Sequence, residues 1–295
     1  MKSGFVSLVG LPNAGKSTLM NRMVGTKLAI VSDKPQTTRT RIRGVRTYPD
    51  GQIVFVDTPG IHRPTHRMNV RMVDTALDAM RDVDVVGVVL DASQKPGGGQ
   101  RHLFQIIRSL TLPVVLVLNK VDLLHKPALL PIIERVSRER DFADIVPVSA
   151  STGDGVEALE RALLARLPDG EPLYPDDYLT DQPERFFVAE IVREQILQNT
   201  HAELPFSTAV VVDQFDEEDR GMLRLYCTIL VERSSQKPIL LGRGGDMIKA
   251  IGTGARLELE RFFDTRVFLD LHVKVKGEWR EDERVLDQLL NRPGE

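Results

Sequence analysis

A glycine-rich segment near the N-terminus, GLPNAGKS at residues 10–17, has the composition of a loop that binds phosphate groups. Gly10 and Gly15 let the backbone turn so that its N–H groups face an anion, and a helix beginning near Lys16 adds its positive end. We expect the Lys16 ammonium to reach the β- and γ-phosphates of a nucleotide and the Ser17 hydroxyl to ligate Mg²⁺. A glycine turn with an incidental lysine is the alternative, but the whole pattern follows a strand and opens a helix. The predicted phosphate-loop residues are Gly10, Leu11, Pro12, Asn13, Ala14, Gly15, Lys16 and Ser17.

A second loop, DTPG at residues 57–60, follows the apolar run IVFV. A carboxylate at the end of a strand can hold magnesium through water, which is the role we expect for Asp57. The N–H of Gly60 can then contact the γ-phosphate. An ordinary β-turn is the alternative, because proline and glycine favour turns. The predicted nucleotide contacts here are Asp57, Thr58, Pro59 and Gly60.

A third loop, NKVD at residues 119–122, predicts which base is bound. Asp122 can accept hydrogen bonds from N1–H and the exocyclic amine of guanine, whereas adenine would leave it unpaired at a cost of about 1–3 kcal/mol. Asn119 would brace the loop, and the stem of Lys120 would cover the face of the base. A helix N-cap at Asp122 is the alternative. The N–H of Ala150, in VSAS at 148–151, is a weaker candidate for a contact with guanine O6. The predicted base-site residues are Asn119, Lys120, Val121, Asp122, Ser149 and Ala150.

Alternating strands and helices must position these loops. Short β-branched runs predict strands at 5–9, 53–56, 85–90, 114–118 and 145–148, and helices are expected at 16–24, 68–82, 100–110, 129–140 and 156–166. Residues 36–48 read as a mobile loop that leads into an edge strand. This alternation predicts an α/β doubly wound fold with a mostly parallel sheet over residues 1–168, and with ligands at the carboxyl ends of the strands.

The pattern changes after a proline-rich, acidic linker at 169–183. Helices are predicted at 184–199 and 246–263, and strands at 207–213, 223–233 and 266–275, which together describe a small α+β domain at 184–280. Residues 281–295 are expected to form a short helix and a frayed tail. Cys227 lies within a predicted strand and is expected to be a small buried hydrophobe.

The composition excludes several classes of protein. With 295 residues, 42% hydrophobic and 27% charged, the chain is typical of soluble globular proteins. The net charge of -3 means that any nucleic-acid site must be local. One cysteine excludes a disulfide within the chain, and a reducing cytosol is the default compartment. Apolar runs such as 85–90 are far shorter than the ~20 residues that span a bilayer, so no transmembrane segment is expected. The apolar N-terminus reads as a strand and not as a signal peptide.

Taken together, these motifs resemble those of the Era family, bacterial Ras-like GTPases of the translation-factor class that carry a C-terminal KH domain. The resemblance rests on GLPNAGKS, PQTTRTR, DTPGIH, NKVD, the acidic YPDDYLTDQP, and ERSSQKPILLGRGG followed by KVKGEWR, and it covers nearly the whole chain. It implies GTP hydrolysis, with GTP and GDP as ligands and with Lys16, Thr38, Gly60 and Asn13 as catalytic residues. It also implies Mg²⁺ at Ser17, Thr38 and Asp57, with Thr37 as the alternative to Thr38.

Two departures from the common Ras pattern affect the expected chemistry. Ile61 stands where many Ras-like enzymes place a water-positioning glutamine, so slow intrinsic turnover is expected. In similar GTPases a potassium ion bound by a phosphate-loop asparagine supplies positive charge, and Asn13 occupies the matching position. K⁺ is therefore a second candidate cofactor. His62 is expected to be a solvated surface residue.

The second region resembles a type II KH domain, whose G-x-x-G loop would be Gly242, Arg243, Gly244 and Gly245. Glycines without side chains let a phosphate backbone lie close, and KH loops clamp about four nucleotides in this way. Lys249, Lys274 and Lys276 are the other predicted RNA contacts. Between residues 233 and 280 there are ten lysines and arginines against six acids, which is the local basic patch. Trp279 is the best candidate for an exposed aromatic, with packing as an equal alternative, and Phe262, Phe263 and Phe268 are expected to pack.

The resemblance further implies partners. In the family the KH domain recognises the 3′ end of 16S rRNA, which implies a role in 30S subunit assembly. Cytoplasmic location with peripheral association with the inner membrane, and a monomeric state, follow by analogy alone. The alternatives are a GTPase acting on another RNA, in tRNA modification or large-subunit assembly, a non-enzymatic RNA-binding module, and a P-loop ATPase, which NKVD disfavours.

Overall fold

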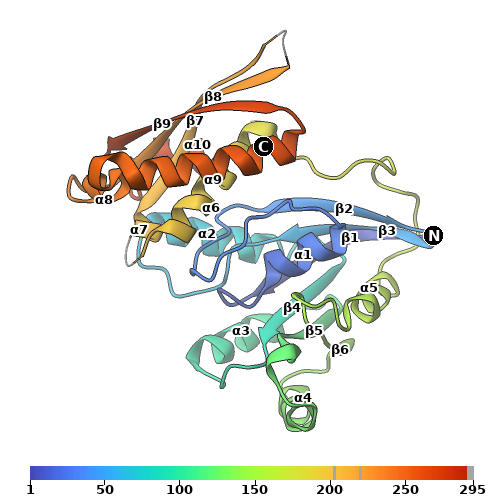
Figure 1. Ribbon diagram of the computed structural model, residues 1–295. Coiled ribbons are helices and arrows are strands. Elements are labelled where there is room, and N and C mark those ends of the chain that lie inside the picture. The colour runs from blue at the N-terminus through green and yellow to red at the C-terminus, as the bar shows by residue number, and fades with distance from the viewer. Residues whose placement is uncertain (202–203, 219–220, 291–295) are drawn as a thin grey trace. The chain divides into compact units, whose positions relative to one another are not determined.

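The computed structural model describes residues 1–201, 204–218 and 221–290, which form two compact units. The first unit comprises Met1–Thr65 and Asn69–Asp181, and the second comprises His66–Met68 and the described residues from Gln182 onward. Each unit is a sheet with helices packed against it (Figure 1). Within the described ranges, no helix combines the length and the apolar character needed to cross a membrane.

The first unit is built on a six-stranded sheet with the order β2-β3-β1-β4-β5-β6. Its strands are β1 (Lys2–Gly10), β2 (Ile42–Tyr48), β3 (Gly51–Asp57), β4 (Val85–Asp91), β5 (Val114–Asn119) and β6 (Asp144–Pro147). Only β2, at one edge, runs antiparallel to its neighbour β3 among these pairs, and the others are parallel. The predicted α/β fold with a mostly parallel sheet is confirmed, and so is the edge strand after residue 36.

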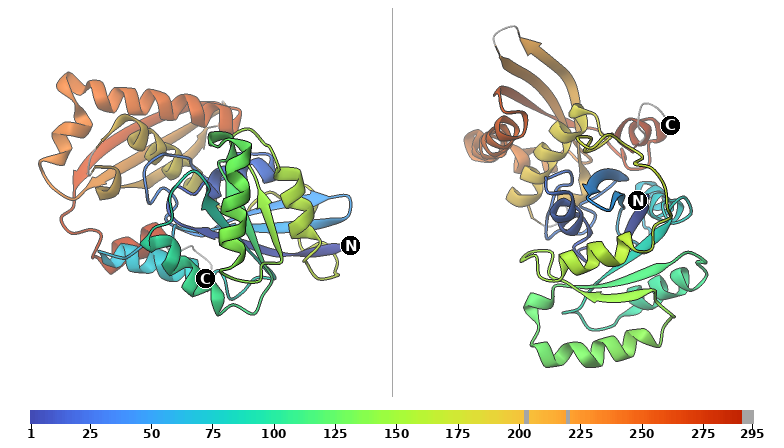
Figure 2. Two further views of the ribbon diagram at one scale, coloured as in Figure 1. Left: turned by 90° about the horizontal axis from the view of Figure 1, so that it is seen from below. Right: turned by 90° about the vertical axis from the view of Figure 1, so that its right-hand side faces the viewer.

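Helices cover both faces of this sheet (Figure 2). They are α1 (Lys16–Val24), α2 (Arg67–Asp78), α3 (Gly98–Arg108), α4 (Leu129–Ser137) and α5 (Val156–Leu164), with short 3₁₀ turns η1 (Val121–Leu123) and η2 (Lys126–Ala128). On one face Val88 and Leu116 of the strands pack with Leu103 of α3, Ala76 of α2 and Val136 of α4. Helices α1 and α5 contact β1 and β3. Burial on both faces explains why the strands read as continuous apolar runs.

The segment predicted as a linker is fastened along the edge of the first unit as far as Asp181. The N–H of Val45 in β2 donates to the carbonyl of Leu179 at 2.8 Å, and Arg43 pairs with the Asp181 carboxylate at 3.0 Å. The side chain of Gln52 bonds to backbone groups of residues 173 and 174. The segment shows no helical or strand periodicity in its sequence because its polar groups form hydrogen bonds with neighbouring strands instead. The predicted domain boundaries themselves stay predictions.

The second unit has a three-stranded sheet with the order β7-β8-β9, in which β7 and β8 are antiparallel and β8 and β9 are parallel. Its elements are α6 (Glu184–Asn199), α7 (Leu204–Ser207), β7 (Thr208–Glu218), β8 (Met222–Val231), α8 (Gln236–Leu241), η3 (Arg243–Gly245), α9 (Asp246–Phe263), β9 (Arg266–Val275) and α10 (Glu283–Leu290). This arrangement confirms the predicted α+β domain.

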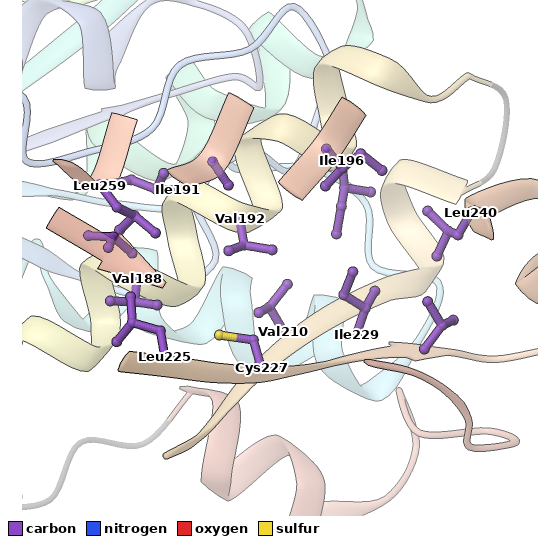
Figure 3. Packing of buried hydrophobic residues seen from close by; sticks show 14 of the residues in the cluster. Val188, Ile191, Val192, Ile196, Val210, Leu225, Cys227, Ile229, Leu240 and Leu259 are labelled. Atoms are coloured by element: carbon purple, nitrogen blue, oxygen red, sulfur yellow. The ribbon is translucent and has the colours of Figure 1, made fainter. Parts of the chain in front are cut away.

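Figure 3 shows the core of the second unit, where side chains of α6 and α9 meet those of β7 and β8. Ile191 and Leu259 come from the helices, and Leu225 and Ile229 come from the sheet. Cys227 is 2% exposed among them, and burial raises the pKa of its thiol to about 12. The expected small buried hydrophobe is confirmed, because such a thiol stays protonated and unreactive near neutral pH.

Two aromatic residues of this unit differ in exposure. Trp279 is completely buried, and its indole N–H donates to the carbonyl of Ser207 at 3.0 Å. Of the two roles open to Trp279, packing is therefore confirmed. Phe268 is 46% exposed, and its ring packs against that of Tyr226 on β8, with 5.9 Å between the ring centroids. Its position on β9 is paired with Arg224 of β8, and it lies on the opposite face of the strand from the buried Val267 and the half-buried Leu269.

Candidate functional site

The phosphate loop between β1 and α1 is a tight turn that depends on its glycines. Asn13 and Gly15 both have positive φ, at 61° and 94°. A Cβ on Gly15 would lie 2.2 Å from Nδ2 of Asn119, and a Cβ on Gly10 would lie 2.3 Å from the carbonyl oxygen of Val89. Glycine is therefore required at both positions because a side chain would collide with atoms that hold the loop in place.

The lysine of this loop is buried beneath it. Lys16 is 6% exposed, and its Nζ lies 3.2 Å from the carbonyl of Leu11 and 3.4 Å from that of Gly10. Burial lowers the pKa of Lys16, while the nearby Asp57 acts in the opposite direction. An ammonium in this environment interacts strongly with an anion, because little water screens it.

The three residues predicted to hold Mg²⁺ lie together. The Ser17 hydroxyl donates to Oδ2 of Asp57 at 2.7 Å, and Thr38 Oγ1 lies 2.8 Å from Ser17 Oγ and 3.2 Å from the same carboxylate oxygen. Asp57 is fully buried, its Oδ1 has no hydrogen-bond partner among the described residues, and burial raises its pKa. Hard oxygen donors around an unsatisfied buried carboxylate fit Mg²⁺. Thr37 instead donates to the carbonyl of Lys34 at 2.6 Å, so the geometry favours Thr38.

The loop that follows β3 packs against the phosphate loop. A Cβ on Gly60 would lie 2.6 Å from the nitrogen of Pro12, and the N–H of Ile61 donates to the carbonyl of Gly10 at 3.0 Å. The Ile61 side chain is 1% exposed. The expectation that His62 is solvated is wrong: its Nδ1 lies 2.7 Å from the Gly60 carbonyl, and its Nε2 is buried without a partner among the described residues.

The base-binding loops are joined through one amide. Asn119, at the end of β5, donates from Nδ2 to the carbonyl of Ala14 at 2.8 Å and accepts at Oδ1 from the N–H of Ala150 at 2.9 Å. Asn119 therefore braces the phosphate loop and the VSAS loop, two contacts that the sequence did not predict. Asp122 is exposed in η1. A contact between Ala150 and guanine O6 stays a prediction, since that N–H is engaged by Asn119.

Sequence reasoning missed two charged residues at this site. Arg22, in the last turn of α1, donates from Nε to the carbonyl of Ala150 at 2.6 Å and from Nη2 to the carbonyl of Ser151. Asp91, at the end of β4, pairs with Nζ of Lys120 at 2.7 Å. No local pattern identifies either residue, because each acts on a loop that is remote along the chain.

The G-x-x-G loop of the second unit lies between α8 and α9 and has positive φ at all three of its glycines. Gly242 has φ 72° and ψ 177°, and a Cβ there would lie 2.7 Å from the nitrogen of Met247. Gly244 and Gly245 have φ of 63° and 89°, and a Cβ on either would meet nothing within 4 Å. The last two glycines thus leave an open surface at the start of α9, where backbone N–H groups can receive an anion.

The predicted basic residues of this unit divide into two groups. Arg243, Lys249 and Lys274 are exposed, and none of them has an ion pair within the described ranges. Lys276 pairs with Asp282 at 3.1 Å, so its charge is partly neutralised. Lys276 also donates its N–H to the carbonyl of Val231, which places the end of β9 beside the end of β8 from which the chain leaves toward the loop.

The phosphate loop, the Ser17, Thr38 and Asp57 cluster, the NKVD loop and the G-x-x-G loop together have the arrangement of a P-loop GTPase followed by a KH domain. Family profiles agree, since the 50S ribosome-binding GTPase family matches residues 5–120 and the KH domain family matches residues 203–280. The chain is 50% identical to GTPase Era of Geobacter metallireducens, over 98% of this chain and 97% of that one. It is 52% identical to GTPase Era of Geobacter sp. strain M21, over 97% of both. The chain therefore belongs to the Era family of GTPases.

Solved structures give the same result. A variant of Aquifex aeolicus Era bound to GDP·AlF₄⁻ is 38% identical, with a TM-score of 0.94 over 98% of this chain and 99% of that one. Era in complex with MgGDPNP and nucleotides 1506–1542 of 16S ribosomal RNA is 38% identical, with a TM-score of 0.95 over 98% of both chains.

Proposed function

We propose that this protein is a GTP-hydrolysing switch that binds the 3′ end of 16S rRNA and acts in assembly of the 30S ribosomal subunit. The observation that carries the proposal is the likeness, over 98% of both chains, to an Era structure that contains MgGDPNP and nucleotides 1506–1542 of 16S ribosomal RNA. The present protein has the Ser17, Thr38 and Asp57 cluster in its first unit and an open G-x-x-G loop in its second unit.

The reaction proposed is in-line attack by water on the γ-phosphorus of GTP. Ser17, Thr38 and Asp57 would hold Mg²⁺, which supplies positive charge beside the β- and γ-phosphates. Lys16 and the backbone N–H groups of residues 10–17 would bind the phosphate oxygens as negative charge develops on them. The buried Ile61 cannot orient water, so turnover without a partner should be slow.

The base would be bound by the loops that Asn119 joins. Asp122 would accept from N1–H and the exocyclic amine of guanine, and Lys120 would cover one face of the base. A competition between GTP and ATP tests this selectivity, because an adenine nucleotide offers neither donor. Equal displacement of a bound fluorescent GDP by both nucleotides would contradict it.

Asn13 would also bind K⁺ as a second cofactor beside the phosphates. Its Nδ2 donates to the carbonyl of Asp33 at 2.6 Å, and its side-chain oxygen Oδ1 is the atom that would bind K⁺. Turnover should then be faster in KCl than in NaCl at equal ionic strength. Equal rates in the two salts would remove this role for Asn13, and the Asn13→Ala variant should show no difference between them.

The nucleotide would set the affinity for RNA. Loss of the γ-phosphate should release the loops at residues 33–44 and 57–75, an order–disorder change of the kind that GTPase switches use. The decisive experiment measures binding of an RNA with the sequence of nucleotides 1506–1542 by the GTP-analogue and GDP forms at one salt concentration. Tighter binding in the GTP-analogue form is expected, and equal dissociation constants would remove the switch.

Crosslinking in cell extract, read by sequencing, tests the identity of the RNA. Contacts outside the 3′ end of 16S rRNA would favour the second candidate, a GTPase of tRNA modification or large-subunit assembly; the family profile described as 50S ribosome-binding supports that candidate. A cytoplasmic monomer with peripheral association with the inner membrane is proposed by analogy to the family. Cell fractionation and analytical ultracentrifugation test the location and the oligomeric state.

A further inference from the structure

The ammonium of Lys120 is held by a carboxylate from the neighbouring strand. Asp91 and Asn119 are paired in register at the ends of β4 and β5, and Lys120 follows directly after Asn119. Nζ of Lys120 lies 2.7 Å from Oδ2 of Asp91, whose side chain is only 9% exposed. An ion pair with one partner this shielded is screened less by water than a surface pair.

The Asp91 carboxylate is also held by hydrogen bonds other than the one from Lys120. It accepts from the N–H of Ser93 at 3.0 Å, from the Ser93 hydroxyl at 2.5 Å and from Nε2 of Gln94 at 3.1 Å. Burial alone would raise the pKa of Asp91, but the hydrogen bonds from Lys120 and Ser93 outweigh it and hold the pKa below its usual value. The carboxylate therefore stays ionised and in one orientation near neutral pH.

Lys120 is constrained at its backbone as well as at its head group. Its φ of 65° is left-handed, which is unusual for a lysine. The next N–H, of Val121, donates to the carbonyl of Val148 at 3.2 Å, and the N–H of Ala92 donates to the carbonyl of Asn119 at 2.9 Å. With both ends held, the four-carbon stem of Lys120 has to run from the end of β5 toward the end of β4.

We propose that Asp91 is a positioning residue for the nucleotide site, which aims the stem of Lys120 so that it forms one wall of the guanine pocket. This inference rests on the proposed role of the NKVD loop. The ion pair restricts the rotamers of Lys120 before the nucleotide binds. The entropy cost of ordering this side chain is therefore not subtracted from the free energy of nucleotide binding. It also directs the charge of Lys120 to Asp91 and not to the phosphates, which leaves Lys16 as their ammonium.

A competing explanation assigns Asp91 to the turn after β4 alone. Its bonds to Ser93 and Gln94 would serve that purpose without Lys120. The two explanations differ in one respect: only the positioning role makes the effect of changing Asp91 depend on the presence of the Lys120 ammonium. A double-mutant cycle measures this dependence directly.

The experiment measures release of fluorescent mant-GDP by stopped flow from the full-length protein and from Asp91→Asn, Lys120→Met and the double variant. Each single change should speed release about tenfold, and the double variant should release no faster than Lys120→Met alone. Asn at position 91 keeps the volume and an acceptor for Ser93, and thermal unfolding of each variant checks that the fold survives. Glu134→Gln removes an exposed ion pair with Arg138 on α4 and is the control for loss of an ion pair, with an expected change below about twofold.

Release from Asp91→Asn at the wild-type rate would overturn the inference while leaving the proposed function intact, provided that Lys120→Met is faster. Additive effects in the double variant would overturn it as well, because they would show that Asp91 acts without the lysine. A change of Asp91 to Glu keeps the charge and should give an intermediate rate, which provides the test should the asparagine variant fail to fold. Failure of the wild-type protein to bind mant-GDP would instead contradict the proposed function.

Discussion

Two glycines of this chain share a backbone conformation and a place at the start of a helix, but they lie in different surroundings. Gly15 has φ 94° and ψ 21° before α1, and Gly245 has φ 89° and ψ 9° before α9. A Cβ on Gly15 would lie 2.2 Å from Nδ2 of Asn119, whereas a Cβ on Gly245 would meet nothing within 4 Å. The same local geometry is enclosed by protein in the first unit and open in the second.

The difference predicts how each loop would receive phosphate. In the first unit Asn119 bonds to the phosphate loop and Lys16 is buried beneath it, so the protein's own contacts already form the site. In the second unit Gly244 and Gly245 supply only a backbone shape and room, so the close contacts have to come from the ligand. We therefore expect added side-chain volume to weaken nucleotide binding at the phosphate loop, and added negative charge to weaken RNA binding at the G-x-x-G loop.

The largest expected effect comes from adding the same methyl group to both loops. Gly15→Ala should lower the affinity for GDP at least about 100-fold, because a left-handed backbone costs about 1–2 kcal/mol in a non-glycine residue and Asn119 must move as well. Gly245→Ala should keep the GDP affinity and lower the free energy of unfolding by about 1 kcal/mol. Calorimetric titration with GDP and denaturant unfolding measure the two quantities, and similar losses of GDP affinity in both variants would refute the comparison.

Charge in the open loop should give the next largest effect. Gly244 has φ 63° and ψ 15°, a conformation that Asn and Asp tolerate better than other side chains. Gly244→Asp should therefore bind the RNA about tenfold more weakly than its matched control Gly244→Asn, since the two differ mainly in charge. Gly242 is unsuitable for this test because a side chain there would collide with Met247.

RNA binding by the two variants is measured by fluorescence anisotropy with an RNA of nucleotides 1506–1542, and GDP affinity is measured beside it. Unchanged GDP affinity in both variants would show that the effect is confined to the second unit. Equal RNA affinity for the aspartate and asparagine variants would mean that no phosphate lies near this loop.

The exposed and the paired lysines should differ in their salt dependence. Lys249 is exposed and has no ion pair among the described residues, whereas Lys276 is paired with Asp282. Lys249→Gln should lower the slope of log K against log salt by about 0.7, the value for one phosphate contact on a single strand. Lys276→Gln should leave the slope nearly unchanged. A larger change for Lys276 than for Lys249 would contradict the division between the two groups.

The smallest expected effect concerns Arg22. Its guanidinium bonds the carbonyls of Ala150 and Ser151, which the single ammonium of a lysine cannot do in the same way. Arg22→Lys should speed nucleotide release about threefold by loosening the VSAS loop. Arg161→Lys, whose partner Glu157 is on the exposed face of α5, is the control and should have no effect. Equal release rates in the wild type and in Arg22→Lys would show that the loop holds its shape without the arginine.

Much of the fold was predictable because its causes are local. Helices α1, α6 and α9 and strand β9 begin and end where the sequence predicted, since glycines, prolines and apolar periodicity mark those ends. The motif loops follow buried strands, and a buried parallel strand has to deliver its carboxyl end to the ligand-binding edge of the sheet. The short helix α8 was not located, because its six residues offer too little periodicity.

The sequence by itself determined the chemistry of the loops and the class of the protein. A phosphate loop or a G-x-x-G loop consists of neighbouring residues, and the types of those residues directly set the backbone conformation of the loop. Only the tertiary structure decided which threonine joins Ser17 and Asp57, that Trp279 is buried, and that Lys276 is paired. It also brought Arg22 to the VSAS loop and Asp91 to Lys120. Those outcomes depend on which strand ends and helix faces contact each other in space, and such long-range contacts cannot be inferred from the spacing of residues along the chain.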